Sequence, residues 1–230
     1  MVFSVLKSRL LNKCYFASGV VQLFEHAKLQ IVNFDINNNS EILDFCKKNA
    51  IDLVICGTEV PLCNGVADVL TANNILCFGP SKMASQLENS KIFMKDVLVK
   101  AGVPTAKYQT FNTNQKNEAF AFIESFDGKI VIKTDGLAFG KGVVICENTE
   151  HAKIELDEFF DGKFGEAGKS VVIEEFLEGK EVSVFAICDG KTAIPFFHAC
   201  DYKKVYDGDL GPNTGGMGSF APSFLEMPTE

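Results

Sequence analysis

The 230-residue sequence lacks tryptophan, has only three histidines and has no excess of basic residues. Its 22 lysines and arginines are outnumbered by 30 acidic residues, which leaves a formal net charge of −8. Nonspecific nucleic-acid binding requires clustered positive charge, so this balance excludes a general nucleic-acid surface. His26, His151 and His198 are scattered, without the spacing of metal ligands and without a nucleophile partner.

Long apolar runs and paired cysteines are also missing. No run approaches the roughly 18 consecutive apolar residues that span a bilayer, and the N-terminus lacks the basic, apolar and small-residue order of a secretory signal. We therefore expect a soluble, cytoplasmic protein that does not bind membranes. The eight cysteines form no CxxC pair and most lie in apolar runs, which predicts buried reduced thiols rather than disulfides or zinc ligands.

The first part of the sequence alternates strand-like and helix-like segments. With 47% hydrophobic residues the chain can bury a core. Short apolar runs alternate with helical patterns over residues 14–80, which predicts a parallel sheet covered by helices on both faces. The chain begins with a helical pattern, FSVLKSRLL, where a doubly wound sheet usually has its first strand. The prediction for residues 1–88 is an incomplete doubly wound α/β domain.

Residues 89–230 have a different pattern, α+β with antiparallel strands. One longer helix is predicted over residues 81–102, ended by Gly102. A helix followed by a loop is predicted over residues 149–165, and Asp189-Gly190 is predicted to be a two-residue hairpin turn. The remaining apolar runs predict strands at 129–135, 142–148, 171–177 and 181–187.

A loop rich in glycine and lysine joins the first two of these strands. Lys133 lies on the first strand, and the loop GLAFGKG contains Gly140, Lys141 and Gly142. Lysine ammonium groups and main-chain N–H groups without a nearby Cβ suit a polyphosphate. The spacing is not that of a Walker A loop, and a strand rather than a helix follows. The alternative is an ordinary hairpin turn with two solvated lysines.

Two further segments suit small-molecule binding. In VVIEEFLEGKE, residues 171–181, a strand leads into an acidic hinge that offers extended backbone for a base and a carboxylate for ribose hydroxyls, although a solvated hairpin corner is the alternative. In residues 199–218, the glycine-rich run GPNTGGMG follows a stretch of mixed charge. Such a composition predicts a loop for a zwitterionic or anionic substrate, and an ordinary surface loop is the alternative.

Six segments, which cover most of the chain from about residue 50 onward, carry a resemblance to one family. They are GTEVPL (57–62), FGPSKMASQLENSKIFMKDVL (78–98), GVPTAKY (102–108), IVIKTDGLAFGKGVVI (130–145), VVIEEFLEGKEVSVFAICDGK (171–191) and DYKKVYDGDLGPNTGGMGSFAP (201–222). They resemble the phosphoribosylamine–glycine ligases, also called glycinamide ribonucleotide synthetases, which are ATP-grasp enzymes of purine synthesis. The lysine and glycine flap is common to ATP-grasp enzymes, whereas GDLGPNTGGMG points to this family.

The resemblance implies ligation of glycine to 5-phosphoribosylamine through a glycyl phosphate made with ATP. It implies a pre-ATP-grasp α/β domain at 1–88 and an incomplete ATP-grasp domain at 89–230, with a flap subdomain at about 109–173. Lys133 and Lys141 would be catalytic. The implied ATP-binding residues are Lys91, Lys133, Gly140, Lys141, Gly142, Glu174, Glu175, Leu177 and Glu181, of which Glu174 and the backbone of Glu175 and Leu177 read adenine and Glu181 binds the ribose.

The resemblance also implies a substrate side and shows departures from the family pattern. The implied substrate-binding residues are Glu59, Asp201, Lys203, Asn213, Thr214, Gly215, Gly216, Met217 and Gly218. Tyr202 and Lys204 stand where the family usually has His and Arg, and Thr58 replaces a proline. No counterpart of the Gly-Gly-Arg-Glu-His turn precedes FSVLKSRLL, so we expect the chain to be truncated at both ends.

The implied cofactors are ATP with Mg²⁺ or Mn²⁺. The metal ligands are expected downstream of residue 230, and no residue of this chain is assigned as one. The expected partners are small molecules (glycine, 5-phosphoribosylamine and ATP), with no nucleic acid and no membrane. Two alternatives stay open: another ATP-grasp carboxylate–amine ligase, and a truncated nucleotide-binding remnant without catalytic activity.

Overall fold

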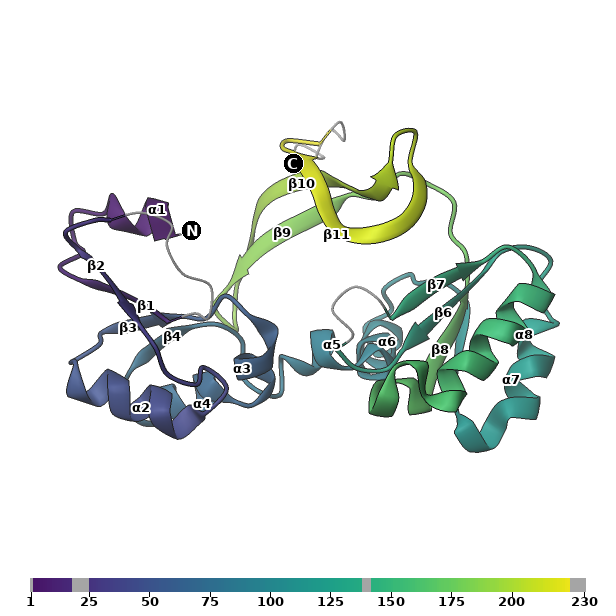
Figure 1. Cartoon of the computed structure of the whole chain (residues 1–230), viewed down its shortest axis with the longest axis horizontal. Helices are drawn as coiled ribbons and strands as arrows, with labels where there is room; N and C mark the ends of the chain where they lie inside the picture. The colour runs from purple at the N-terminus through teal and green to yellow at the C-terminus, as the bar shows by residue number, and fades with distance from the viewer. Residues whose placement is uncertain (1, 18–24, 138–141, 224–230) are drawn as a thin grey trace. The chain divides into compact units, whose positions relative to one another are not determined.

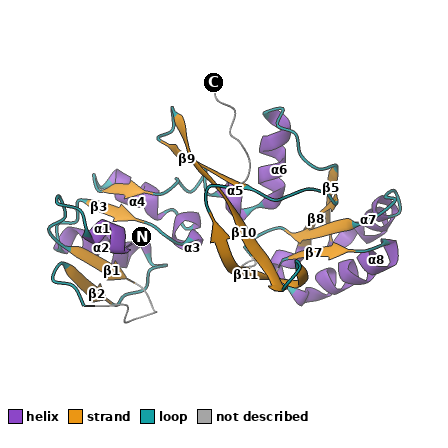
Figure 2. Cartoon of the chain, turned by 90° about the horizontal axis from the view of Figure 1, so that it is seen from above, coloured by secondary structure: helices purple, strands orange, loops and turns teal. Residues whose placement is uncertain are grey.

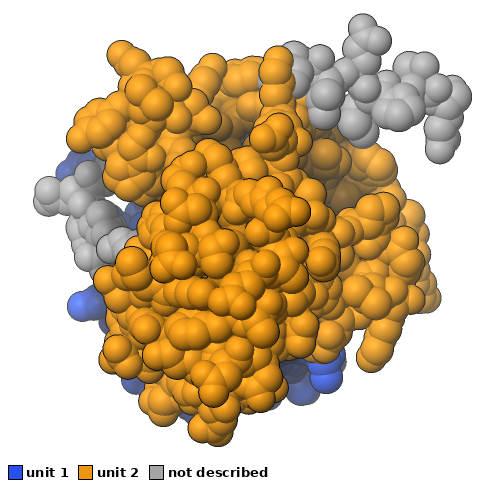
Figure 3. Space-filling view, turned by 90° about the vertical axis from the view of Figure 1, so that its right-hand side faces the viewer, with its two compact units in different colours: residues 1–89 blue, residues 90–230 orange. Residues whose placement is uncertain are grey.

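The computed structural model describes residues 2–17, 25–137 and 142–223. The chain divides into two compact units, residues 1–89 and residues 90–230, which are coloured separately in Figure 3. Each unit has its own cluster of buried apolar side chains.

Unit 1 alternates short strands and helices, as the sequence predicts. Its strands pair in parallel, β1 with β2 and β3 with β4. In the described residues these are two separate two-stranded sheets rather than one continuous sheet. The elements are α1 (Val2–Leu6), β1 (Cys14–Ala17), β2 (Leu29–Val32), α2 (Asn39–Lys48), β3 (Leu53–Ile55), α3 (Glu59–Cys63), α4 (Val66–Ala72), β4 (Leu76–Phe78) and α5 (Gln86–Asn89).

The core of unit 1 lies between α2, α4 and the β3–β4 pair. Asn38 caps α2, because its side chain accepts hydrogen bonds from the first turn. Ile42 and Cys46 lie four residues apart on one face of α2, and Val66 and Leu70 repeat this spacing on α4. The helical periodicity of the sequence therefore places these four side chains in one cluster.

Within residues 2–17 and 25–89, which the structure describes, helices pack on one face of the β3–β4 pair. Its alternating residues Leu53, Ile55, Leu76 and Phe78 are exposed, while the residues between them pack against the α2–α4 cluster. The prediction of helices on both faces is therefore wrong for these strands. Apolar runs in the sequence show that both faces can be buried, but they do not supply the element that covers the second face.

Unit 2 contains a four-stranded antiparallel sheet in the order β5-β8-β6-β7. Helices α7 and α8 lie side by side along this sheet (Figures 1 and 2). The helices and strands of unit 2 are α6 (Lys91–Lys100), β5 (Tyr108–Asn112), α7 (Lys116–Ile123), β6 (Ile130–Thr134), β7 (Val143–Cys146), α8 (Thr149–Glu158), β8 (Ser170–Glu175), β9 (Ser183–Cys188), β10 (Ala193–Tyr206) and β11 (Leu210–Phe220), with short 3₁₀ turns at Thr113–Gln115 and Gly165–Lys169 and a π turn at Phe159–Lys163.

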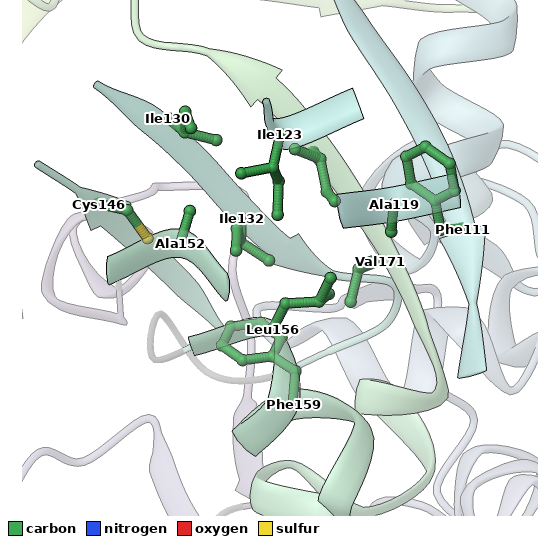
Figure 4. Close-up of a cluster of buried hydrophobic side chains, with 11 residues drawn as sticks. Phe111, Ala119, Ile123, Ile130, Ile132, Cys146, Ala152, Leu156, Phe159 and Val171 are labelled. Carbon is green, nitrogen blue, oxygen red and sulfur yellow. The ribbon is translucent and has the colours of Figure 1, made fainter. Parts of the chain in front are cut away.

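The core of unit 2 fills the space between the sheet and helices α7 and α8 (Figure 4). Ile132 of β6, Ile123 of α7 and Leu156 of α8 are fully buried there. Strand β6 pairs with β7 in a hairpin from Ile130 opposite Cys146 to Lys133 opposite Val143. The predicted hairpin around the glycine and lysine loop is therefore confirmed.

The single helix predicted over residues 81–102 is wrong, because the structure divides it into α5 and α6. Ser90 stands between them in an extended conformation, and its side chain accepts a hydrogen bond from Phe93 N. Asp135 accepts hydrogen bonds from Ser90 Oγ at 2.9 Å and Ile92 N at 3.1 Å. The new helix start is stabilised by a carboxylate 45 residues away, which helical periodicity in the sequence cannot reveal.

Strands β9, β10 and β11 form an antiparallel three-stranded sheet in which β10 is central. The prediction of a loop for the glycine-rich run is wrong, because residues 211–218 belong to β11. Extra β11 residues between the paired positions, and positive φ angles at Gly211 and Gly216, let this run follow β10. The hairpin turn between β9 and β10 is centred on Gly190-Lys191, one residue later than predicted, because Asp189 N donates to Thr192 O across it.

The eight cysteines are free thiols, but most are not fully buried as predicted. Cys46, Cys146 and Cys200 are buried, Cys188 is exposed and the others are partly exposed. Apolar neighbours in the sequence do not decide which face of a strand is covered. None of the described helices is long and apolar enough to cross a bilayer.

Candidate functional site

Lys133 and Glu174 lie on the face of the four-stranded sheet opposite the core. Their sequence neighbours Ile132 and Ile173 point into the core between the sheet and helices α7 and α8. Because side chains alternate along a strand, Lys133 and Glu174 point to the other face. In the β6–β8 register Val131 lies opposite Glu174, so Lys133 is a diagonal neighbour of Glu174 on that face.

Two lysines form ion pairs with the Glu174 carboxylate. Lys133 Nζ contacts Oε1, and Lys95 Nζ of α6 lies 2.5 Å from Oε2. Glu174 and Lys95 are buried, whereas the Lys133 side chain is 25% exposed. Lys95 Nζ also donates to Thr105 Oγ1 at 2.7 Å and lies 4.9 Å from the centre of the Tyr108 ring. Helix α6 therefore covers this end of the sheet with a charged side chain.

Lys95 is the member of this cluster that the family motifs do not single out. It lies one helical turn after Lys91, within the largely apolar stretch IFMKDVLV. A lysine among apolar residues of a helix is a signal for a buried ion pair, since a buried ammonium needs a partner. The identity of that partner depends on the packing of α6 against β8.

Lys91 lies at the first turn of α6, beside the loop that follows β6. Its Nζ donates to Gly136 O at 3.1 Å. The same loop supplies Asp135, which binds Ser90 and Ile92 at the helix start. These contacts bring Lys91 to the end of the strand that carries Lys133. Gly140 and Lys141 lie outside the described residues, and Gly142 O accepts a hydrogen bond from Thr134 N at 2.8 Å, at the base of the hairpin.

The hinge after β8 offers fewer free groups than the sequence suggests. Glu175 N donates to Lys107 O at 3.0 Å, and Glu175 Oε1 accepts from Lys107 N at 2.7 Å. The Glu175 N–H is therefore already used within the fold. Phe176 N donates to Lys129 O at 3.3 Å, and the Leu177 side chain is exposed after the strand has ended.

A second group of predicted residues lies on the three-stranded sheet. Lys203 of β10 forms an ion pair with Glu181, which precedes β9. The hydrogen bond to Glu181 raises the pKa of Lys203, against the opposing effect of burial. Thr214 Oγ1 of β11 donates to Lys203 O at 2.9 Å and accepts from Gly216 N at 3.1 Å. Asp201 lies opposite Ser219 in the β10–β11 register.

The predicted site residues thus fall into separate groups. Lys91 lies where the hairpin leaves β6, Lys133 and Glu174 form an ion pair across β6 and β8, and Glu175 lies opposite Ile130 at the other end of β6. Glu181, Lys203 and the 213–218 segment are connected through the three-stranded sheet. Glu59 is the first residue of α3 in unit 1. Among the described residues no three His, Cys, Asp or Glu side chains are arranged to hold a metal ion.

Comparison with known families assigns both units. The model described as "Phosphoribosylglycinamide synthetase, N domain" matches residues 1–88, and "Phosphoribosylglycinamide synthetase, ATP-grasp (A) domain" matches residues 89–229. The chain belongs to the phosphoribosylglycinamide synthetase family. Its fold is accordingly an α/β N domain followed by an ATP-grasp domain of α+β type.

Individual proteins with similar sequences have names that match this family. The chain is 45% identical over 228 residues to phosphoribosylamine–glycine ligase of Mesorhizobium japonicum. The aligned region covers 99% of this chain and 53% of that protein. It is 47% identical over 194 residues to the chloroplastic enzyme of Arabidopsis thaliana, covering 84% of this chain and 36% of the relative. The chain spans about half the length of the bacterial relatives it matches.

A solved structure of the same family shows the same fold. The crystal structure of phosphoribosylamine–glycine ligase from Thermotoga maritima superposes with a TM-score of 0.59 at 38% sequence identity. The match covers 66% of this chain and 38% of that chain.

Proposed function

We propose that this chain is the nucleotide-binding part of a phosphoribosylamine–glycine ligase. The observations that carry the proposal are the Lys133–Glu174 ion pair on one face of the four-stranded sheet and the hydrogen bond from Lys91 to the Gly136 carbonyl, where the glycine-rich hairpin leaves that sheet. Two ammonium groups beside a loop of low side-chain volume suit the phosphates of ATP. Membership of an ATP-grasp family supports ATP as the nucleotide.

The chemistry of the proposed reaction needs positive charge rather than a protein nucleophile. A glycine carboxylate oxygen attacks the γ-phosphorus of ATP, and ADP leaves. The nitrogen of phosphoribosylamine then attacks the carbonyl carbon of glycyl phosphate; the C–N bond forms as phosphate leaves, and the nitrogen loses one proton to solvent. Charge on the transferred phosphoryl group is what the protein stabilises, so lysines at the phosphates are the expected catalytic groups.

Each predicted residue has a role in this proposal. Lys91 and Lys133 bind phosphates, and Gly140, Lys141 and Gly142 close over them as a flap. Glu174 faces adenine together with the Glu175 carbonyl and the Leu177 backbone, since the Glu175 N–H is already used. Glu181 binds ribose, and the substrate side comprises Glu59, Asp201, Lys203 and the segment Asn213, Thr214, Gly215, Gly216, Met217, Gly218.

The proposed domain roles follow the two units. Residues 1–88 are the pre-ATP-grasp domain, and residues 89–230 belong to the ATP-grasp domain with a flap subdomain at about 109–173. ATP-grasp chemistry with Mg²⁺ or Mn²⁺ would place the cation at the phosphates. The described acidic side chains form no cluster that fits it, so we assign no step to a metal ion.

Calorimetric titration of the 230-residue chain with ATP tests the proposed site. Lys133→Ala is expected to weaken ATP binding at least about tenfold, or about 1.4 kcal/mol, because a phosphate loses its partner in a partly dry site. Lys116→Ala is the matched control, since Lys116 also pairs with a carboxylate, Asp157, but is 45% exposed on α7. Equal affinity of the Lys133 variant and wild type would remove Lys133 from the site.

Turnover tests the proposed substrates. The measurement is ADP release with ATP and glycine, with and without phosphoribosylamine, and hydroxylamine is added to trap the acyl phosphate as glycine hydroxamate. Hydroxamate that requires glycine and ATP and disappears in Lys133→Ala supports the ligase. If the chain binds ATP but yields hydroxamate only with another carboxylic acid, glycine is excluded as the substrate.

A further inference from the structure

One buried carboxylate on the site face of the four-stranded sheet contacts two ammonium groups. Glu174 is 4% exposed and Lys95 is 3% exposed, while Lys133 reaches toward solvent from the neighbouring strand. With two lysines and one glutamate, the cluster has a formal charge of one positive unit. The two ion pairs use different oxygens of Glu174, so one lysine does not displace the other.

Lys95 cannot itself be a ligand-binding residue in this arrangement. Its ammonium is enclosed by the Glu174 carboxylate, the Thr105 hydroxyl and the face of the Tyr108 ring. Burying an ammonium group lowers the stability of the folded state unless the group is paired, and removing one member of a buried ion pair leaves the other charge without a partner. Enclosed in this way, Lys95 acts on the site by compensating the charge of Glu174.

We propose that Lys95 is a positioning residue of the proposed nucleotide site, one that neutralises Glu174 from the inner side and leaves the charge of Lys133 available to a phosphate. This inference rests on the proposed function, because it assumes that Lys133 meets a polyphosphate. Without Lys95, Glu174 and Lys133 form a one-to-one ion pair. Their attraction at a largely buried carboxylate holds Lys133 on Glu174 and cancels its field at the phosphate.

The phosphates and the adenosine part of the nucleotide should respond differently to the loss of Lys95. The net charge of the cluster acts on phosphate oxygens, whereas the uncharged adenosine part does not respond to it. Loss of Lys95 should therefore weaken binding of ATP and of inorganic tripolyphosphate, with little effect on adenosine. A variant that merely loosens the packing of α6 against β8 weakens all three probes.

The experiment measures dissociation constants of the 230-residue chain for ATP, tripolyphosphate and adenosine by calorimetry. Lys95→Met keeps an unbranched side chain of similar volume and removes the charge. The expected result is binding weaker by about tenfold or more for ATP and tripolyphosphate, with a change below about twofold for adenosine. Lys116→Met, which removes an exposed paired lysine, is the matched control and is expected to change each constant by less than about twofold.

A double variant tests the mechanism of the effect. In Lys95→Met with Glu174→Gln, Lys133 no longer faces a carboxylate, so tripolyphosphate affinity should return to within about threefold of wild type. Glu174→Gln alone serves as its reference, and tripolyphosphate avoids any contact that Glu174 makes with adenine. Circular dichroism checks folding. If Lys95→Met does not fold, the double variant is compared with Glu174→Gln alone. Equal tripolyphosphate affinities of these two proteins are expected only if Lys95 acts through Glu174, so this comparison still tests the proposal.

The outcomes distinguish the two proposals. If the wild-type chain binds neither ATP nor tripolyphosphate, the proposed nucleotide site is wrong and the role of Lys95 falls with it. If wild type binds both and Lys95→Met binds both equally well, only the inference about Lys95 is overturned. Loss of adenosine binding together with tripolyphosphate binding, without recovery in the double variant, would show that Lys95 has a structural role only.

Discussion

At the scale of single residues, two cysteines with similar neighbours in the sequence differ in burial. Cys146 and Cys188 both lie in apolar sequence runs, yet Cys146 is fully buried behind α8 and Cys188 ends an exposed strand. Burial, with a smaller contribution from Glu155, raises the pKa of Cys146 from 9.0 to about 12. The two thiols should therefore differ in reactivity and in their effect on stability.

The raised pKa of Cys146 predicts a loss of stability at alkaline pH. Above pH 9 the unfolded chain releases the thiol proton while the folded chain keeps it, so this thiol's contribution is complete below pH 9 and is lost as pH rises toward 12. The free energy of unfolding should fall by up to about 1.4 kcal/mol per pH unit more in wild type than in Cys146→Ala. Urea unfolding at a series of pH values measures this difference. Parallel curves for the two proteins would contradict it.

Thiol labelling offers an independent check at the residue scale. Iodoacetamide at pH 8 is expected to modify exposed Cys188 readily and Cys146 only after unfolding, because the thiolate is the reactive form and burial disfavours it. Mass spectrometry of peptides after timed labelling measures both rates. Equal rates at the two sites would show that β7 and α8 do not enclose Cys146.

At the scale of elements, glycine allows β11 to follow β10 where its sequence predicts a loop. A Cβ at Gly211 would come within 2.6 Å of Tyr206 and 2.8 Å of Val205, and its φ of +85° disfavours other residues. Gly215 has nothing within 4 Å of such a Cβ. The two glycines of one strand therefore have different structural requirements.

Gly211→Ala should disturb the β10–β11 pairing, whereas Gly215→Ala should not. The expected cost of the first substitution is about 1–2 kcal/mol, from strain at positive φ and the close contact with Tyr206. Hydrogen exchange of the β11 amides should become faster in Gly211→Ala and stay close to wild type in Gly215→Ala. Unchanged exchange in the Gly211 variant would contradict the pairing of Leu210 and Asn213 with β10 on either side of it.

At the scale of the whole molecule, each unit has a buried core of its own. Leu70 is fully buried between α2 and α4 in unit 1, and Leu156 is fully buried between α8 and the four-stranded sheet in unit 2 (Figure 4). No residue belongs to both clusters among the described residues. Core substitutions should therefore act on one unit at a time.

Leu70→Ala and Leu156→Ala are expected to lower different unfolding transitions. Each removes a buried side chain and leaves a cavity, at a cost of about 2–5 kcal/mol in its own unit. Calorimetry should show that Leu70→Ala lowers the melting temperature of one transition and Leu156→Ala that of another. A single transition that both variants lower equally would show that the two units unfold as one.

The sequence by itself determined the alternation of strands and helices in unit 1, the hairpin around Lys133 and the family, because these depend on local periodicity, turn residues and short motifs. The resemblance to the family predicts Lys91, Lys133 and Glu174 as phosphate and nucleotide residues, and their binding roles stay predictions. Only the tertiary structure decided that Lys95 pairs with Glu174, which is 79 positions away in the sequence. It also decided that Asp135 accepts hydrogen bonds from Ser90 and Ile92 at the start of α6, which are 45 and 43 positions away. It also decided that residues 211–218 form a strand, because backbone pairing with β10 outweighs the weak strand preference of glycine.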